Sequence, residues 1–379
     1  MKKQMKQIGF YEGLPLTDKN SFLEKLAETP VPKKRELLVE ISAVSVNPVD
    51  VKFRMQTPKQ ESFTVLGFDA VGRIVAKGPQ SENFEIGDRI YYAGSAKQPG
   101  SNQEYQLVDE RIVAKAPENL TDEASAALPL TAITAYELLF EKFQLIPKES
   151  ANKGKKILVI NGAGGVGSIL TQLAKWSGLE VVATASPKNF QWLKENGVDH
   201  PIDYHQELKP QLEKVGISTV DVVAVLHDIR PYLTELAEMI QPMGKIGMIV
   251  GLDGPIDIAS FKNLSVSFEW EYMFTKTDYG QLIETQGEIL KHLTALVEEE
   301  KIHTTLGKVY REGISKETLK QATKEVETGK VHGKVVITGG FASNEIATEK
   351  YISTFQSLTN HLRMLFKLFC RIKSIKRFF

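Results

Sequence analysis

The stretch that most constrains the fold is ILVINGAGGVGS, residues 157–168, in which an apolar run leads directly into a group of glycines. The apolar run is typical of a strand covered on both faces, and SILTQLAKW after the glycines is typical of a helix. A strand, a G-x-G-x-x-G turn and a helix in this order predict a dinucleotide-binding βαβ unit. The alternative is a tight glycine turn that binds nothing.

Each glycine has a physical reason in such a unit. Gly162 permits the tight turn, Gly164 lets the backbone approach a pyrophosphate, and Gly167 lets the helix pack closely on the strand. Gly165 and Val166 begin the helix, whose free N–H groups and positive dipole end face the phosphates. A nucleoside triphosphate loop is excluded, because no Gly-Lys-Ser/Thr follows.

The glycine turn lies in a region where strands and helices alternate. KKILVI, LEVVATA, TVDVVAVL and GKIGMIVG read as strands, and a helical segment follows each of the first three. Apolar strands spaced by helices predict a parallel, doubly wound sheet. Residues 36–113 differ, because short β-rich runs such as DRIYYAG are separated by turns. GKVVITGGF at 333–341 reads as a last strand.

The end of the second strand indicates which dinucleotide is bound. An NAD site usually has Asp or Glu there, about 20 residues after the glycines, to hold the ribose 2′-hydroxyl. This chain has Ser186 and Lys188 instead, and the nearest acid is Glu195 in the next helix. A hydroxyl and an ammonium group suit a 2′-phosphate, so we predict NADPH. The alternative for Lys188 is a solvated loop lysine.

Composition narrows the class of protein. The 379 residues are enough for two domains, and 47 basic residues balance 47 acidic ones, so no overall field favours nucleic acid. A single cysteine, Cys370, excludes a disulfide framework and a multi-thiolate metal site, and it fits a reducing cytoplasm. No signal-peptide pattern and no 18-residue apolar run is present. We therefore expect a cytoplasmic protein.

The chain resembles the medium-chain dehydrogenase/reductase superfamily, in its quinone oxidoreductase-like branch, where many bacterial members are labelled zinc-type alcohol dehydrogenase-like proteins. SAVSVNPVDVKFR, LGFDAVGRIVAKG, FEIGDRIYYAG, the glycine turn and GKVVITGGF carry the resemblance over residues 6–341, in the family's order. It implies an α/β architecture with two domains. A GroES-like β-rich domain would cover 1–129, completed by 306–341, and a Rossmann domain with a doubly wound parallel sheet would cover 130–305.

The resemblance also implies roles for cofactor-binding residues. Lys188 approximately matches a lysine that binds the 2′-phosphate, with Ser186 and Asn189 as co-candidates. Tyr204, in PIDYHQE, matches a tyrosine that packs near the adenosine phosphate in quinone reductases.

Three residues are implied on the catalytic side. Asn47 lies where the family places a substrate-facing amide, and Thr131 lies near the nicotinamide in relatives. For both, the alternative is a local turn or helix-cap bond. Lys52 stands at a position that is often tyrosine in the quinone reductases, and the alternative is a solvated lysine.

The ligands of the superfamily's zinc enzymes are missing. Those enzymes use a Cys, a His-Glu pair and a later Cys or His, whereas this chain has Asn47 and the triplet Gly67-Phe68-Asp69 at the first two positions. Zinc needs soft or imidazole ligands in a tetrahedral array, and the seven histidines are scattered. We predict no metal site, with Asp50 and Asp69 as structural hydrogen-bond acceptors.

These observations predict an NADPH-dependent oxidoreductase that transfers hydride to a quinone or an α,β-unsaturated carbonyl without zinc. Hydrogen-bond donors aimed at the developing oxyanion would replace the metal. One alternative is a zinc-type alcohol dehydrogenase. Another is a non-catalytic NADPH-binding sensor or structural protein.

The stretch NLSVSFEWEYMF, residues 263–274, alternates apolar and polar residues and is expected at the sheet edge. Family members pair this edge strand with its copy in a second subunit, and pairing protects an otherwise exposed edge. We predict a homodimer. The alternative is that Trp270 and Tyr272 pack inside one chain.

Residues 342–379 lie beyond the resemblance. NHLRMLFKLFCRIKSIKRFF has a basic amphipathic pattern that is compatible with a membrane surface or a partner groove. Its apolar face would carry Leu362, Leu365, Phe369 and Ile372. We favour a non-native extension without such a role.

Overall fold

The structure is a computed structural model that describes residues 2–341. Residues 2–340 belong to one compact unit. Within the described part of the chain, no helix is long and apolar enough to cross a membrane. The amphipathic pattern predicted in 342–379 lies outside the described residues.

A six-stranded parallel sheet is built around the glycine turn, in the order β10-β9-β8-β11-β12-β13. The strands are β8 (Lys156–Ile160), β9 (Glu180–Ala185), β10 (His200–Asp203), β11 (Val220–Val225), β12 (Ile240–Met248) and β13 (Ser267–Trp270). This is the strand order of the dinucleotide-binding fold, in which the order reverses between β8 and β11. The predicted Rossmann sheet is confirmed.

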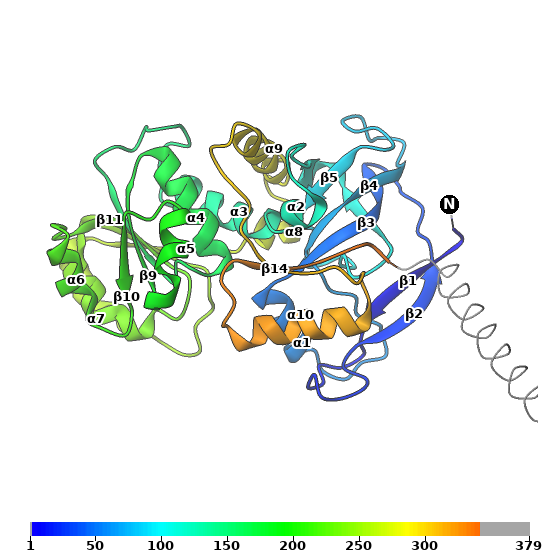
Figure 1. The fold of residues 1–379 in the computed structure, drawn as a ribbon, viewed down its shortest axis with the longest axis horizontal. Helices are drawn as coiled ribbons and strands as arrows, with labels where there is room; N and C mark the ends of the chain where they lie inside the picture. The colour runs from blue at the N-terminus through cyan, green and yellow to red at the C-terminus, as the bar shows by residue number, and fades with distance from the viewer. Residues whose placement is uncertain (1, 342–379) are drawn as a thin grey trace, which may run out of the picture. The chain divides into compact units, whose positions relative to one another are not determined.

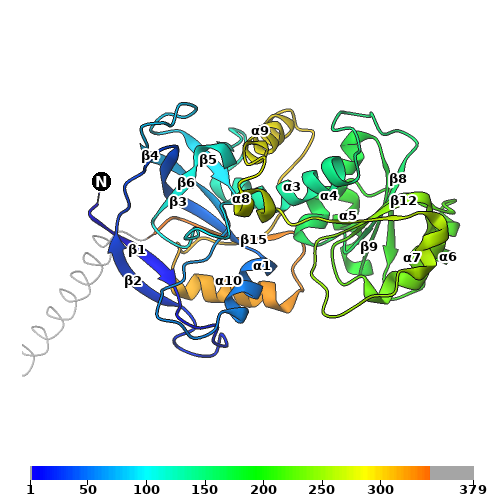
Figure 2. The same cartoon turned by 180° about the vertical axis from the view of Figure 1, so that it is seen from behind.

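Helices cover both faces of this sheet, as Figures 1 and 2 show from opposite sides. They are α4 (Gly165–Ser177) and α5 (Phe190–Glu195) on one face, and α6 (Leu208–Lys214) and α7 (Leu233–Met239) on the other. Leu158, Val182 and Val223 of the strands are fully buried. Helices on both faces of the sheet therefore explain why its strands are apolar along their whole length.

A seven-stranded sheet forms the other half of the compact unit, in the order β14-β15-β3-β4-β5-β7, with β6 paired to β3. Its strands are β3 (Glu36–Val46), β4 (Asp69–Lys77), β5 (Arg89–Tyr92), β6 (Tyr105–Asp109), β7 (Val113–Lys115), β14 (Leu306–Tyr310) and β15 (Lys334–Thr338). The late strand predicted in GKVVITGGF is confirmed as β15, and it joins the N-terminal strands by pairing antiparallel to β3. The domain boundaries at 129/130 and 305/306 stay a prediction.

Within residues 2–341, four short 3₁₀ helices lie at Glu110–Ile112, Pro187–Asn189, Arg230–Tyr232 and Ala259–Leu264. A hairpin and seven further α- or π-helical segments accompany the two sheets. They are β1 (Gln4–Gly9), β2 (Leu23–Glu28), α1 (Pro48–Gln56), α2 (Asp122–Ala126), α3 (Pro129–Tyr136), a π-helical segment (Glu137–Lys142), α8 (Phe274–Tyr279), α9 (Glu284–Glu298) and α10 (Lys316–Thr328). Pro129 occupies the first turn of α3, where a missing N–H costs nothing, and this explains the predicted break between two helices. α3 packs on both α4 and α9 and so links the two sheets.

The predicted edge strand is shorter than its sequence pattern. β13 lies at the sheet edge as expected, but it spans only Ser267–Trp270. Ser265 has a left-handed φ of 52° and closes a turn. The N–H of Val266 therefore bonds to the carbonyl of Phe261 in this turn and not to a neighbouring strand. Trp270 and Tyr272 are 48% and 44% exposed, and the Tyr272 ring lies 5.4 Å from Phe274 of the same chain, so the alternative of packing within one chain stays open. The homodimer stays a prediction.

Candidate functional site

The glycine turn starts with Asn161, which has a left-handed φ of 68°. The N–H of Gly162 bonds to the carbonyl of Thr184 at 2.9 Å, so the turn lies against the end of β9. A Cβ at Gly162 would come within 2.7 Å of the Cβ of Ala183. Gly162 thus lies in the turn and lets it pack closely on β9, while Asn161 takes the left-handed backbone conformation.

The other glycines lie at the start of α4. A Cβ at Gly167 would lie 2.5 Å from the carbonyl oxygens of Asn161 and Gly162, which agrees with its predicted packing role. Gly164 is the N-cap, and a Cβ at Gly164 would lie 3.1 Å from its nearest neighbour, the side-chain nitrogen of Asn161. No side chain caps this helix, and its first turn has no acid. The N–H groups of Gly165, Val166 and Gly167 are therefore free for an anion.

The predicted 2′-phosphate residues lie at the end of β9. Ser186 follows the strand directly, and its hydroxyl is 3.1 Å from the hydroxyl of Tyr204, which follows β10. Lys188 is exposed in the short turn Pro187–Asn189. Among residues 2–341, Lys188 has no ion pair or hydrogen bond through its side chain. The structure thus brings Ser186 and Tyr204 together. The cation Lys188 lies two residues after Ser186 in the sequence.

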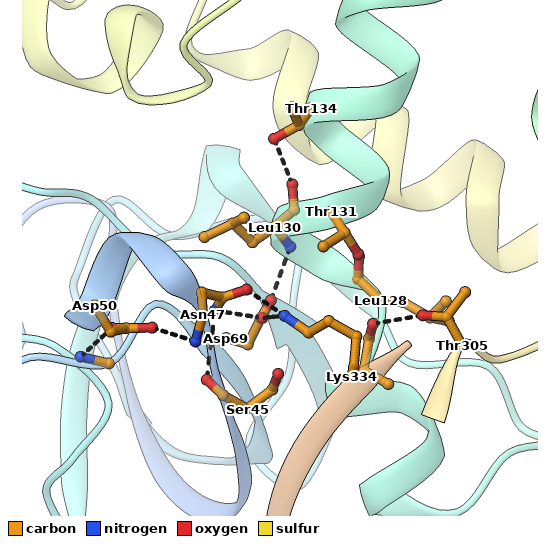
Figure 3. A network of polar contacts seen from close by, with 12 residues as sticks. Ser45, Asn47, Asp50, Asp69, Leu128, Leu130, Thr131, Thr134, Thr305 and Lys334 are labelled. Carbon is orange, nitrogen blue, oxygen red and sulfur yellow. Dashed lines mark hydrogen bonds and ion pairs between the residues drawn. The ribbon is translucent and has the colours of Figure 1, made fainter. Parts of the chain in front are cut away.

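Asn47 has a different environment, which Figure 3 shows. Its side-chain nitrogen donates to Asp69 Oδ2 at 2.9 Å and, more weakly, to the carbonyl of Ser45 at 3.4 Å. Its side-chain oxygen accepts a hydrogen bond from Lys334 Nζ. Lys334 also forms an ion pair with Asp69 Oδ2 at 2.7 Å. In this structure, the Asn47 amide therefore has no free donor for a substrate.

Asp69 is the centre of this network. Its second oxygen accepts the backbone N–H of Leu130 at 2.8 Å, so one carboxylate joins β4, β15 and the start of α3. Asn47, Asp69 and Lys334 are 1%, 0% and 3% exposed. Lysine is almost never buried unless it is paired, so Asp69 and Lys334 depend on each other.

Sequence reasoning missed Lys334. The available signal was a charged residue that begins an otherwise apolar strand, KVVIT, directly after a glycine. That glycine, Gly333, has a φ of 62° and donates its N–H to the carbonyl of Ala163 in the glycine turn. Ala163 and Gly333 are 170 residues apart in the sequence, so no sequence motif indicates this contact.

The start of β15 thus packs against the glycine turn. A Cβ at Gly165 would lie 3.0 Å from Lys334 Cδ and 3.3 Å from Thr131 Cγ2. Thr131 is buried, and its hydroxyl donates to the carbonyl of Leu128 at 3.1 Å. The hydroxyl of Thr131 makes the local bond that was the alternative to a catalytic role, while its methyl group borders the turn.

The residues at the zinc-ligand positions do not fit a metal. Phe68 is apolar, and the oxygens of Asn47 and Asp69 already bind the Lys334 ammonium group. A second cation there would meet the positive charge of Lys334 at hydrogen-bonding range. Among residues 2–341, no group of three or more His, Cys, Asp or Glu side chains is placed to hold a metal ion.

Asp50 is an acceptor, as predicted. Its carboxylate binds the N–H of Asn47 at 2.8 Å and the N–H of Gly67 at 3.2 Å. Burial raises the pKa of Asp50 to about 7, and the nearby charge of Asp69 adds to the rise. A small pocket borders Asp50, Ser45 and Arg54, and the Ser45 hydroxyl and Arg54 Nε have no partner within the described residues.

Lys52 lies on α1 with its side chain exposed. Its Nζ is 3.7 Å from the position that a Cβ at Gly251 would take, three residues after β12 ends. α1 follows β3 of the seven-stranded sheet, so Lys52 reaches across to the carboxyl edge of the parallel sheet.

Aromatic side chains gather near the same edge. The ring of Phe53 is 5.8 Å from that of Phe68, and Phe68 is 4.6 Å from Phe274. Tyr272 lies 5.4 Å from Phe274 and is the exposed member. Phe53 and Phe68 come from the N-terminal segment, whereas Tyr272 and Phe274 follow β13. We call these four residues the aromatic cluster.

Buried charges anchor the segment that carries Tyr272 and Phe274. Lys276 Nζ lies 3.0 Å from a carboxylate oxygen of Glu137 and 2.7 Å from one of Glu141. Glu271 packs against Glu137, and burial together with that neighbouring charge raises the pKa of Glu271 to about 10. The two ion pairs of Lys276 hold the segment against the π-helical turn, an irregularity that is frequent at functional sites.

Two family models match the chain. The alcohol dehydrogenase GroES-like domain matches residues 33–118, and the zinc-binding dehydrogenase model matches residues 196–337. The chain is 41% identical to a zinc-type alcohol dehydrogenase-like protein of Staphylococcus epidermidis over 88% of this chain and 99% of that protein. It is 31% identical to a 2-methylene-furan-3-one reductase of Solanum lycopersicum, over 83% of this chain and 74% of the relative.

A third relative is the chloroplastic NADPH-dependent alkenal/one oxidoreductase of Arabidopsis thaliana, with 29% identity over 83% of this chain and 75% of the relative. Solved structures agree with the fold. A putative zinc-dependent alcohol dehydrogenase from Rhizobium etli superposes with a TM-score of 0.83 at 38% identity, covering 90% of this chain and all of that one. The quinone oxidoreductase of Coxiella burnetii gives 0.72 at 26% identity, covering 89% and 100%.

Proposed function

This chain is an oxidoreductase of the medium-chain dehydrogenase/reductase superfamily. On this basis we propose that it transfers hydride from NADPH to a quinone or an α,β-unsaturated carbonyl. The observation that carries the proposal is the uncapped start of α4 behind the glycine turn. It lies beside the point where the strand order reverses, which is where this fold binds dinucleotides.

The residues at the turn fit the cofactor. The N–H groups of Gly165, Val166 and Gly167 would bind the pyrophosphate, because no side chain or acid competes for them. Ser186, Lys188 and Tyr204 would hold the 2′-phosphate, since the hydroxyl groups of Ser186 and Tyr204 meet after β9 and Lys188, two residues after Ser186, is a cation without a carboxylate partner among residues 2–341. Bound NADPH would supply the hydride.

The aromatic cluster supports a planar, conjugated acceptor. Stacking on Phe and Tyr rings favours flat molecules, and Tyr272 exposes an edge of the cluster at the carboxyl edge of the sheet. The reductase and oxidoreductase names of the tomato, Arabidopsis and Coxiella proteins point to the same acceptor class.

We also propose that the reaction is independent of zinc. Hydride addition to a quinone or an enone gives an anion that is delocalised over the conjugated system, so hydrogen-bond donors suffice to stabilise it. The unsuitable donor set at Asn47, Phe68 and Asp69 supports this choice over a zinc-type alcohol dehydrogenase.

An acceptor screen tests the proposal. Purified protein with NADPH should consume the cofactor absorbance when quinones and enones are offered, and it should be inactive with ethanol and NADP⁺. Tight NADPH binding without oxidation by any member of the screen would favour the non-catalytic alternative, which the fully bonded Asn47 amide otherwise supports.

A further inference from the structure

The first turn of α4 is built from residues that form helices poorly. Glycine stands at its N-cap and at two of its first three positions, as Gly164, Gly165 and Gly167. Glycine is unfavourable in a helix, because it loses more backbone freedom than any other residue on folding. No side chain caps this helix. The N–H groups that the proposed cofactor would use therefore belong to a turn that its own residues stabilise weakly.

Ser168 supports this turn from the buried side. Its N–H donates to the carbonyl of Gly164 at 2.9 Å, and its hydroxyl lies 2.9 Å from the same oxygen and 3.4 Å from the carbonyl of Ala163. The Gly164 carbonyl and the Gly165 N–H belong to one planar trans peptide unit and point in opposite directions. Because Ser168 holds the carbonyl towards the helix, the Gly165 N–H points out of the helix start, where the pyrophosphate is expected.

The hydroxyl of Ser168 is in turn held by Trp192 of α5. Trp192 Nε1 donates to Ser168 Oγ at 2.8 Å, and Ser168 is fully buried. An indole N–H can only donate, so the serine oxygen accepts this bond and its single hydrogen is left for the carbonyls of the turn. Two hydrogen bonds in such a chain strengthen each other. The indole therefore fixes the rotation of the hydroxyl and reinforces its bond to Gly164.

The indole ring is itself held by the start of β15. The ring centroids of Trp192 and His332 are 4.4 Å apart, and a Cβ at Gly333 would lie 2.9 Å from Trp192 Cζ2. His332 and Gly333 directly precede β15, and the N–H of Gly333 donates to the carbonyl of Ala163 at 3.0 Å. The Trp192 side chain is thus fixed between the glycine turn and a strand of the seven-stranded sheet.

We propose that Trp192 is a positioning residue for NADPH, which acts through Ser168 to hold the Gly164–Gly165 peptide in the orientation that meets the pyrophosphate. This inference rests on the proposed NADPH-dependent function. A donor that is already oriented binds its ligand more tightly, because the ligand does not have to order it. The alternative is that Trp192 only fills the space between α5 and β15, in which case its indole N–H would not affect cofactor binding.

Three variants and one control test this role. Trp192→Phe removes the N–H and keeps an aromatic ring beside Gly333, Ser168→Ala removes the hydroxyl, and the third variant combines the two changes. The control is Trp176→Phe, which removes an indole from the last turn of α4. We expect the affinity for NADPH, measured by nicotinamide fluorescence, to fall about fivefold in Trp192→Phe and about tenfold in Ser168→Ala.

The combined variant shows whether Trp192 acts through Ser168. It should lose about tenfold, as Ser168→Ala does, because the indole N–H has no effect once the hydroxyl is gone. Trp176→Phe should bind NADPH like the wild type.

A second ligand separates positioning from a general loss of structure. Adenosine 2′-monophosphate carries the 2′-phosphate but has no pyrophosphate. Its affinity, measured by calorimetry, should therefore be unchanged in all variants, whereas a locally unfolded site would bind both ligands less tightly.

Three results would overturn the role of Trp192. They are a wild-type affinity for NADPH in Trp192→Phe, an additive loss of about fiftyfold in the combined variant, and an equal loss for NADPH and adenosine 2′-monophosphate. If Trp192→Phe does not fold, Ser168→Ala decides, because a wild-type NADPH affinity in that variant also overturns the role. A wild-type protein that binds neither ligand would instead reject the proposed cofactor.

Discussion

The glycine turn and the Asn47 network are both polar, both lie where the two sheets meet, and yet they use their hydrogen-bonding groups in opposite ways. At the turn, the first N–H groups of α4 have no side-chain partner. In the network, Asn47, Asp69 and Lys334 satisfy one another in nearly complete burial. Polarity alone therefore does not mark a ligand site in this protein. Donors left without a partner mark it.

The largest expected effect comes from breaking the network. Lys334→Met leaves the buried Asp69 carboxylate without its cation, and removal of one partner of a buried pair costs about 3–5 kcal/mol. Urea denaturation should show this loss, and the exposed Lys330→Met should show none. The double variant Lys334→Met/Asp69→Asn should recover part of the stability. A single Lys334→Met variant as stable as Lys330→Met would mean that the ion pair is not structural.

The glycine turn should respond in the opposite way to substitution. Gly164→Val places a branched side chain where the phosphates are expected, and we predict that NADPH affinity falls at least about a hundredfold with little change in melting temperature. Gly162→Val should instead destabilise the fold, because its side chain would collide with Ala183. Full retention of NADPH binding by Gly164→Val would return the turn to a purely structural role.

Asp50 gives the network a pH dependence. Its folded pKa of about 7 lies above the ordinary value of 3.8, so the folded protein keeps a proton that the unfolded chain has lost between these pH values. The stability contribution is therefore present below about pH 4 and is lost as the pH rises towards 7. The stability of the wild type relative to Asp50→Asn should fall by up to roughly 4 kcal/mol over this range. Parallel pH profiles of the two proteins would contradict the raised pKa.

The smallest predicted change concerns cofactor choice. Lys188→Glu replaces a cation near the 2′-phosphate by an anion, and loss of a charge-assisted bond worth roughly 1.5–3 kcal/mol weakens NADPH by about tenfold to a hundredfold. The exposure of Lys188 favours the lower figure, and NADH should change little. The control is Lys194→Glu, which changes an exposed lysine of α5 a few residues after Lys188. An equal loss for both cofactors would show that Lys188 is not at the 2′ position.

The sequence predicted the parallel sheet and the glycine turn because their signals are local: apolar runs, glycine spacing and the absence of an acid after β9. β10 escaped prediction, because HPID is short and contains a proline. Lys334 and its contacts with Asn47 and the glycine turn are long-range, and no spacing in one sequence reveals them. The bond from Trp192 to Ser168 is equally hidden, since only three-dimensional packing shows that the two side chains meet.

NADPH oxidation by metal-depleted protein tests whether side chains and NADPH suffice for the reaction. The protein is treated with a chelator, its zinc content is measured, and its rate with a neutral quinone or enone is compared with that of untreated protein. We predict an unchanged rate at well under one zinc per chain, because Lys334 already occupies the oxygens of Asn47 and Asp69. A rate that is lost on chelation and restored by one equivalent of zinc would show that the reaction depends on the metal.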